Sequence, residues 1–208
     1  MIVALEPALE LPYLKLLNEY FAASERNNRA SSIDDKKQLM TIKEQMMELC
    51  HHNPHKREVL KRIILAAFSK REKTVIISRA NSAMSELLEA FALEEEMKDI
   101  GVMLLSSELN VHEVTSLIDR FSRSMDAAVL LITDSANPSL NLSAANHLVH
   151  YDYPDSDVLL MQRNNRITRQ TSYHTEATIY YLMSEGKIDQ FNYQMCMNEH
   201  GEIKNVML

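Results

Sequence analysis

Three arginines and two glutamines lie close together in the segment QRNNRITRQ, which runs from residue 162 to residue 170. Arginine carries a permanent charge and a planar fork of donors, so it can clamp phosphate oxygens and stabilise the charge that develops during phosphoryl transfer. In a helix, Gln162, Arg166 and Arg169 would share one face, because they are spaced at i, i+4 and i+7. The alternative is a solvent-exposed basic face. The rest of the chain must decide between these interpretations.

Composition limits the partners that the chain can have. With 208 residues, of which 46% are hydrophobic, it can bury one well-packed core and is too apolar to be disordered. Its net charge of -7 argues against a protein that coats nucleic acid indiscriminately. We therefore expect any contact with DNA or RNA to be confined to one face.

Several common kinds of site and signal are missing from the sequence. Cys50 and Cys196 lie far apart without a CxxC partner, so the sequence predicts neither a disulfide framework nor a CxxC metal knuckle, which suits a reducing compartment. No apolar run approaches the ~18 residues that span a bilayer, and no signal peptide opens the chain. We expect an intracellular protein of the cytoplasm, nucleoid or nucleus, or a virus-encoded protein inside its host cell. The chain has three glycines and no GxxxxGK[ST] loop, so it cannot cradle a triphosphate in the P-loop manner.

Residues 1–72 have the pattern of a helical lead-in segment. A short extended start at residues 2–5 is followed by a predicted helix over 11–23, with Leu14 and Phe21 among its apolar residues. A second helix is predicted from Ser31 or Ser32, and a third over 55–69, which the charged turn after residue 69 ends.

Residues 73–208 alternate between strand and helix patterns. Strands are predicted over 74–78, 102–105, 127–133, 147–151 and 178–183, and helices over 82–97, 111–124, 158–169 and 187–197. This alternation predicts an α/β domain with a parallel sheet and helices on both faces. Ligands bind at the carboxyl ends of the strands in such sheets, so the turns that follow the strands are the expected site.

Five motifs in order resemble the second RecA-like lobe of the Swi/Snf-type ATPases, a group of superfamily two helicases and translocases. KTVIIS at 73–78 resembles the family strand KvlIFs, and residues 129–154 resemble vlLlsTdaageGLNLqaAn.vihyDlP. QRNNRITRQ resembles QRiGRihRiGQ. LCHHNP at 49–54 resembles the segment lrqiCnHP before the lobe, and YYLMSEGKID at 180–189 resembles yrLvteGTiEe after it.

The resemblance implies a division of labour between two lobes. The first lobe of such ATPases binds ATP and Mg²⁺ through its P-loop, and the second supplies arginine fingers, which by motif position would be Arg166 and Arg169. The resemblance further assigns nucleotide contacts to Gln162 and Asn137. The resemblance and the strand ends together place nucleic-acid backbone contacts at four positions: Ser78, Arg79, Ser107 and Thr133. The expected partners are an N-terminal P-loop lobe and duplex DNA, and no membrane. Alone, the chain is expected neither to hydrolyse ATP nor to bind it tightly.

The chain departs from the family pattern at several motif positions. Ser139 and Asn165 replace motif glycines, and Asp155, Ser156 and Asp157 replace a WNP segment. Glycine permits positive φ and close backbone approach, so these changes put the coupling to ATP in doubt. The second hypothesis is therefore a non-catalytic module that binds DNA or a protein partner, and a third is a regulator that docks on a helicase. On each hypothesis the chain can be a fragment, a split-gene product or a stand-alone homologue.

Other residues invite a functional interpretation beside a structural one. The four residues Cys50, His51, His52 and His55 are potential zinc ligands, but the motif match favours packing and turn roles. We expect His147 and His150 to be structural, and Asp152 to orient the turn into the arginine segment. Methionines 40, 46 and 47 are candidates for core filling, or for a surface that a partner lobe covers.

Overall fold

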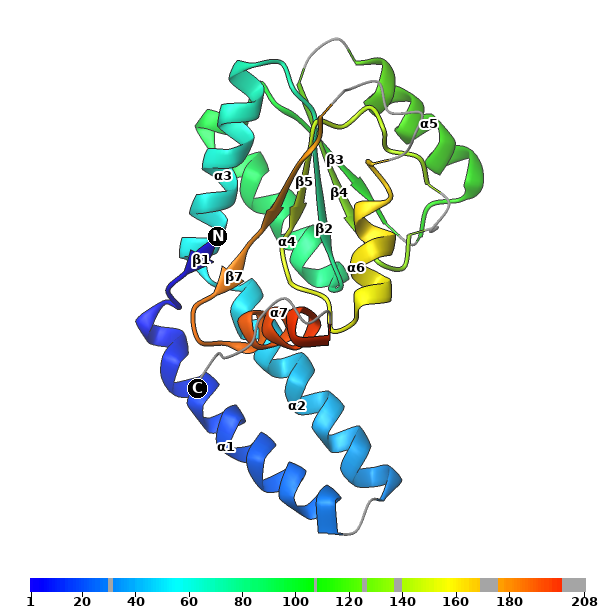
Figure 1. The fold of residues 1–208 in the computed structure, drawn as a ribbon. Helices are drawn as coiled ribbons and strands as arrows, with labels where there is room; N and C mark the ends of the chain where they lie inside the picture. Colours follow the sequence, from blue (N-terminus) through cyan, green and yellow to red (C-terminus); the bar gives the residue numbers. More distant parts are fainter. Residues whose placement is uncertain (30–31, 107, 125–126, 137–139, 169–175, 200–208) are drawn as a thin grey trace.

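A computed structural model of the chain describes residues 1–29, 32–106, 108–124, 127–136, 140–168 and 176–199. Its centre is a parallel sheet of five strands in the order β3-β4-β2-β5-β6 (Figure 1). The strands are β2 (Thr74–Ser78), β3 (Gly101–Leu105), β4 (Ala128–Thr133), β5 (His147–His150) and β6 (Thr178–Tyr181). The predicted α/β fold with a parallel sheet is confirmed.

Helices cover both faces of the sheet. Helices α3 (Pro54–Ser69) and α4 (Asn81–Leu93) pack on one face, and α5 (Val111–Arg123) packs on the other. Successive strand residues point to opposite faces, so Ile76 lies in the first core and Val75 and Ile77 lie in the second. This two-sided burial explains why the strands have continuous apolar runs. The helix predicted over 82–97 ends early, at Leu93, and a 3-10 turn (η1, Glu95–Met97) follows it.

The three central strands end beside one another. Ser78 at the end of β2 pairs in register with Thr133 at the end of β4, and Ile77 pairs with His150 at the end of β5. The chain passes from β4 to β5 across β2, so this edge contains the point where the strand order reverses. Such a point is where ligands of open α/β sheets bind.

Two long helices form a hairpin that projects from the sheet (Figure 1). Helix α1 (Pro7–Arg29) packs against α2 (Ile33–His51), and Ser32 caps the start of α2 by accepting a hydrogen bond from the Asp35 amide. The hairpin has its own small core, which includes Tyr13, Ala23, Ile42, Met46 and Cys50.

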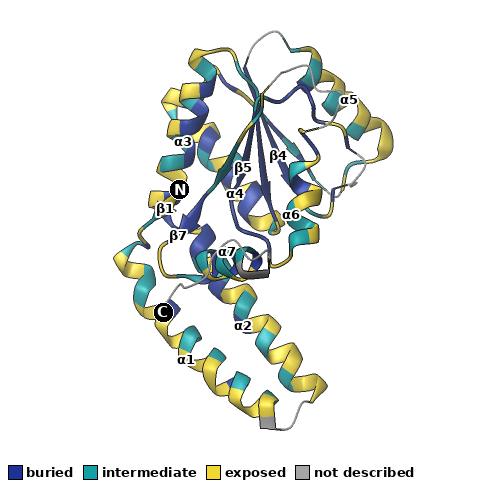
Figure 2. Cartoon of the chain, viewed as in Figure 1, coloured by how far each residue is buried: buried dark blue, intermediate teal, exposed yellow. Residues whose placement is uncertain are grey.

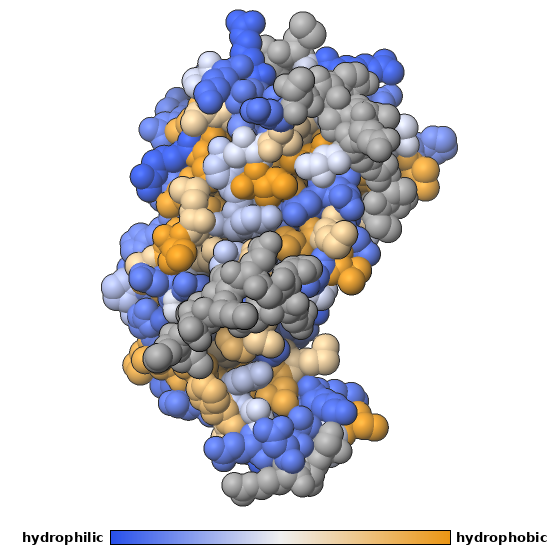
Figure 3. All heavy atoms as spheres, viewed as in Figure 1, coloured by the Kyte–Doolittle hydropathy of each residue, from blue (hydrophilic) through white to orange (hydrophobic). Residues whose placement is uncertain are grey.

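The surface of the hairpin exposes apolar residues as well as polar ones. Figure 2 shows that most of its residues are exposed, and Figure 3 shows hydrophobic residues among the hydrophilic ones along it. The apolar face expected on α1 was partly wrong, because Leu14 is 47% and Phe21 57% exposed. The buried stripe is centred on Tyr13 and Ala23 instead, since these positions face α2.

A second, two-stranded sheet joins the beginning of the chain to its last strand. Strand β1 (Ile2–Val3) pairs in parallel with β7 (Met183–Ser184), so the strand predicted over 178–183 is divided between β6 and β7. Helix α7 (Ile188–Glu199) follows, and a buried ion pair of 2.7 Å between Lys56 Nζ and Asp189 Oδ2 joins it to α3. Among the described residues, no helix combines the length and the apolar character needed to cross a bilayer.

Candidate functional site

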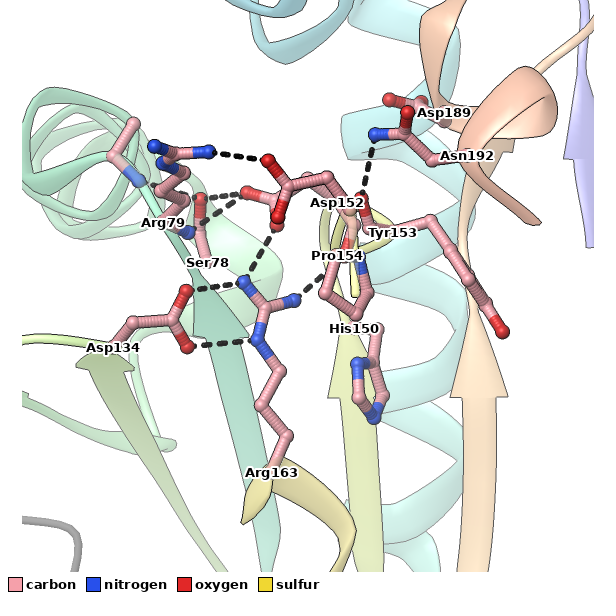
Figure 4. A network of polar contacts seen from close by, with 12 residues as sticks. Ser78, Arg79, Asp134, His150, Asp152, Tyr153, Pro154, Arg163, Asp189 and Asn192 are labelled. Atoms are coloured by element: carbon pink, nitrogen blue, oxygen red, sulfur yellow. Dashed lines mark hydrogen bonds and ion pairs between the residues drawn. The ribbon is translucent and has the colours of Figure 1, made fainter. Parts of the chain in front are cut away.

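A buried network of charges occupies the carboxyl edge of the three central strands. Ser78 ends β2, Asp134 follows β4 directly, and Asp152 lies two residues after β5. Arg163 reaches this edge from helix α6 (Asp157–Asn164) (Figure 4). Four elements that are distant in sequence therefore meet at one point.

The guanidinium of Arg163 holds this network together. Its Nε and Nη2 donate to the two carboxylate oxygens of Asp134 at 2.8 and 2.6 Å, which is a bidentate pair. Nη2 also donates to Asp152 Oδ1 at 2.8 Å, and Nη1 donates to the Asp152 carbonyl at 2.8 Å. Burial disfavours the charged form, but the carboxylates of Asp152 and Asp134 outweigh it and raise the pKa of Arg163 above its ordinary value. The arginine is thus a fixed cation inside the protein.

Asp152 collects donors from three further groups. Its Oδ2 accepts hydrogen bonds from the Ser78 hydroxyl, from the Arg79 amide at 2.9 Å, and from His51 Nε2 at 3.0 Å. Burial favours the neutral acid, but Arg163 and these bonds hold the pKa of Asp152 well below its usual range. The expectation that Asp152 orients the turn into the arginine segment is confirmed, because Arg163 binds both its carbonyl and its carboxylate.

His51 connects the helical hairpin to this network. It is the last residue of α2, and its ring lies buried between Asp152 and Tyr151, with which it stacks at a centroid distance of 5.9 Å. The Tyr151 hydroxyl donates to the His51 carbonyl at 2.8 Å. The orientation of the hairpin is therefore coupled to the strand ends.

Arg166 lies just beyond the end of α6. The helix predicted over 158–169 stops at Asn164, so the interpretation that Gln162 and Arg166 share one helical face was wrong. Arg166 is 3% exposed, and its Nη2 donates to the Ala136 carbonyl at 3.2 Å. Gln162 is exposed on α6. A role of Arg166 as an arginine finger stays a prediction, and its guanidinium is turned inward here.

The hydroxyls predicted to contact nucleic acid are bonded within the chain. Ser78 is buried against Asp152, and Thr133 Oγ1 lies buried, 2.7 Å from Ser135 Oγ. The half-exposed guanidinium of Arg79 pairs with Asp155 at 3.1 Å. Contacts of these residues with phosphate stay predictions. Arg169, Asn137 and Ser107 lie outside the described residues, as does Ser139.

The departures from the family motifs have local structural roles. Asn165 has a φ of -64°, so the position of the motif glycine does not require a left-handed backbone here. Asp155 neutralises Arg79, and Ser156 caps α6 by accepting a hydrogen bond from the Leu159 amide at 3.4 Å. Ser156 thus supports the start of α6, and Asp155 joins this segment to the turn after β2.

The cysteine and the three histidines considered as metal ligands have separate partners. Cys50 is buried in the hairpin, and burial raises the pKa of its thiol to about 12. His51 binds Asp152, His52 binds Glu86 at 3.0 Å, and His55 binds Glu6 at 3.2 Å. Within the part of the chain that the structure describes, no three His, Cys, Asp or Glu side chains cluster as ligands of a metal would.

The roles of Arg163 and of Asp134 were not predicted from the sequence. Arg163 was counted among the three arginines of the segment but not named as a candidate finger, and Asp134 was given no role. A usable signal was present, because acidic residues follow two strands that were both predicted to be buried. Buried carboxylates require a partner of opposite charge, and Arg163 is the cation nearest in sequence to Asp152.

Comparison with known proteins identifies relatives of this architecture. The family described as helicase conserved C-terminal domain matches residues 55–171. The protein YwqA of Bacillus subtilis (strain 168), which carries the name of an ATP-dependent helicase/translocase, is 28% identical over 156 residues. The DNA repair and recombination protein RAD26 of Saccharomyces cerevisiae is 25% identical over 152 residues. These matches cover 71% and 67% of this chain but only 16% and 14% of those two proteins.

Solved structures show the same fold. The Sulfolobus solfataricus SWI2/SNF2 ATPase C-terminal domain aligns with a TM-score of 0.70 at 15% identity, over 100% of this chain and 88% of that one. The SWI2/SNF2 ATPase core of the same organism in complex with dsDNA aligns with a TM-score of 0.72 at 17% identity, over 93% of this chain and 42% of that one. Identities this low show the fold alone. Together with the family match, they confirm the resemblance drawn from the five motifs.

Proposed function

We propose that this chain, which belongs to the helicase conserved C-terminal domain family, acts as the second RecA-like lobe of a Swi/Snf-type DNA-dependent ATPase. Its membership rests on a match to more than half of its 208 residues. The match includes the arginine segment and all three strands that end at the buried network. The activity would belong to the pair of lobes and not to this chain alone.

The observation that carries the proposal is the clamp of Arg163 on Asp134 and Asp152. It ties the end of α6, and with it the turn that holds Arg166, to the carboxyl edge of the sheet. Nucleotides of open α/β sheets bind at this edge. A rigid mount of this kind suits an arginine that must be presented to a phosphate, because catalysis by such groups depends on positioning.

The nucleotide site would be shared between the two lobes. The sequence has no P-loop, so the partner lobe would hold ATP and Mg²⁺, and bound ATP would supply the free energy of phosphoryl transfer. This chain would contribute Gln162 and Arg166. Because Arg166 now donates to the Ala136 carbonyl, it would have to leave that bond to reach a phosphate.

Duplex DNA is the proposed substrate for movement. One structural relative is described in complex with dsDNA. In this proposal the loop ends after β2 and β4, where the predicted backbone contacts lie, would face the duplex. Arg79 could serve there only after giving up Asp155, since the two side chains neutralise each other.

A second candidate function is a non-catalytic module that binds a protein or DNA. It is favoured by a specific observation, namely that most of the described candidate side chains, though not the exposed Gln162, are engaged inside the chain. Ser78 binds Asp152, Arg79 binds Asp155, and Arg166 binds Ala136. These contacts would have to be exchanged during an ATPase cycle.

The test is reconstitution with a P-loop lobe encoded in the same genome, first identified by its GxxxxGK[ST] loop and by co-purification. We expect ATP hydrolysis that duplex DNA stimulates in the mixture and in neither lobe alone. Arg166→Ala should lower the rate about 10³-fold or more. Turnover by the chain alone, or full activity of this variant, would contradict the proposal.

Because Arg166 is buried, the rate must be separated from folding. Arg123→Ala is the matched control, since Arg123 is exposed on α5, outside the predicted site, and can be removed without disturbing the core. Both variants should unfold within a few degrees of the parent in a thermal melt. A rate that falls only in proportion to the folded fraction would favour the non-catalytic module.

A further inference from the structure

A hollow of about 570 Å³ lies between α2, the turn after β2 and the start of α7. Its apolar wall is formed by Met40 and Met47 of α2 and by Ile188 of α7. The two methionines are seven residues apart, so they lie on one face of α2, two turns or ~10 Å from each other. Met40 is 56% exposed, which leaves a large apolar side chain in water.

The charges around the hollow do not balance. Arg79 and Asp155 pair with each other, and Lys43 is drawn toward the ring of Tyr20, with its Nζ 5.8 Å from the centroid. Glu44 and Glu48 remain on the rim, on successive turns of α2.

Among the residues that the structure describes, neither glutamate has a strong partner. The contact of Glu48 with His52 is long, at 3.9 Å, and that histidine also binds Glu86 at 3.0 Å. Like charges at i and i+4 of a helix repel each other and destabilise it slightly. The rim is therefore negative beside an apolar wall, and a cation placed between the two carboxylates would relieve their repulsion.

We propose that this groove docks an amphipathic helix of a partner protein, with apolar side chains against Met40, Met47 and Ile188 and with Lys or Arg beside Glu44 and Glu48. Methionine side chains are flexible and polarizable, so they adapt to the side chains of a docked helix. Met40 and Met47 are two turns apart on α2, so an amphipathic helix with apolar side chains at a similar spacing could contact both. A nucleic-acid backbone is disfavoured because the unbalanced charge is negative. This docking does not depend on the proposed ATPase function.

The experiment uses the methyl groups of the methionines as reporters. Protein labelled with ¹³C at the methionine methyls is titrated with a synthetic Leu/Lys peptide of about 15 residues, long enough to form a helix, whose leucines recur at i, i+4 and i+7. We expect saturable shifts at Met40 and Met47. Met46 is buried in the core of the hairpin and does not line the hollow, so its methyl should shift less than those of Met40 and Met47.

Controls separate docking from general attraction to an acidic protein. A peptide of identical composition in scrambled order should bind at least about tenfold more weakly. Glu44→Lys/Glu48→Lys should weaken binding of the amphipathic peptide about tenfold, whereas Glu19→Lys, a charge reversal on the exposed face of α1, should leave it nearly unchanged. Met47→Gln should also weaken it, which tests the apolar wall.

Three outcomes would overturn the proposal. The first is equal binding of the scrambled and amphipathic peptides, and the second is unchanged binding by the double charge reversal. The third is a shift of the Met40 and Met47 methyls by duplex DNA that competes with the peptide, which would make the groove a nucleic-acid surface.

Discussion

Two fully buried ion pairs in this molecule are built in different ways. Arg163 lies among four hydrogen bonds to Asp134 and Asp152, and the Asp152 carboxylate takes three further donors. Lys56 has one ion pair within the described part of the chain, with Asp189 at 2.7 Å, and it lies beside the ring of Tyr151. Asp189 Oδ2 also accepts the Ser184 amide at 2.9 Å, but its Oδ1 has no hydrogen-bond partner among the described residues.

The difference shows which of the two ion pairs fixes the relative positions of several helices and strands. A fully satisfied network fixes the relative positions of every element that enters it, and the Arg163 network joins β2, β4, β5, α2 and α6. A single buried pair contributes little net stability, because desolvation offsets the attraction between the charges. We therefore regard Lys56–Asp189 as a link between α3 and α7 alone, and the Arg163 network as the structure that positions the candidate site.

The largest effect is expected from Arg163→Met. This change leaves Asp134 and Asp152 without their buried cation, so the free energy of unfolding should fall by about 3–5 kcal/mol in urea denaturation. Arg163→Lys keeps the charge but loses the fork and should recover only part of this loss. If Arg163→Met unfolds at the same urea concentration as the parent, the network does not stabilise the fold.

A smaller loss of stability is expected at the Lys56–Asp189 ion pair, and a second substitution should restore most of it. Lys56→Met should cost about 3 kcal/mol by leaving Asp189 charged and buried. The double change Lys56→Met/Asp189→Asn should return to within about 1 kcal/mol of the parent, because the amide oxygen still accepts the Ser184 amide. The parallel double change Arg163→Met/Asp152→Asn should not recover, since Asp134 stays charged. If both double variants recover the stability of the parent equally, the Lys56–Asp189 pair and the Arg163 network do not differ in the way proposed.

The pH dependence of stability gives a third test, through His150 beside the network. Burial, and then the charge of Arg163, lower the pKa of His150 to about 3, from 6.5 in the unfolded chain. The unfolded state therefore binds the proton first, so stability is full above pH 6.5 and falls as the pH drops toward 3. Between pH 7 and pH 5 the loss should be at most about 2 kcal/mol.

His150→Gln should flatten this part of the stability profile, measured by urea denaturation at a series of pH values. His112→Gln, on the exposed surface of α5, is the matched control and should keep the slope of the parent. A slope that survives the loss of His150 would show that another group takes up the proton.

The smallest effect is expected far from both pairs, at the end of α3. The Arg71 amide donates to the Phe68 carbonyl and the Glu72 amide to the Ala67 carbonyl, which is a Schellman motif, and Arg71 has a φ of 57°. Glycine adopts this conformation without the steric cost of a side chain, so Arg71→Gly should stabilise the fold by about 0.5 kcal/mol. Arg71→Ala keeps the strain and should show no gain in a thermal melt.

Local pattern was enough to predict most of the fold. Strand Thr74–Ser78 has the predicted bounds because its β-branched run is buried on both faces and polar residues flank it. Helix α2 is capped by Ser32, one of the two serines, Ser31 and Ser32, from which it was predicted to start. The order of strands and helices, and with it the motif resemblance, depends on such local signals.

The site was less accessible from the sequence because its contacts are distant along the chain. His51 and Asp152 are separated by 101 residues, and Arg163 and Asp134 by 29. The helical spacing of the arginines was a misleading guide, since α6 ends at Asn164 before it reaches Arg166. On α1, periodicity did not show which of two apolar stripes would meet α2, and Tyr13 is buried while Leu14 is exposed.

The pairing of β1 with β7 has a consequence for synthesis on the ribosome. Ile2 lies opposite Met183, so the first strand has no partner until about 180 further residues have been made. At about 5–20 residues per second, this interval lasts on the order of 10–40 s. During that time the sheet core can assemble from β2 to β5 while the beginning of the chain stays unpaired. Strand β1 is thus among the last elements to pair. In a nascent chain in which β1 has not yet paired with β7, protease should cut near residues 2–6 while the sheet is already resistant.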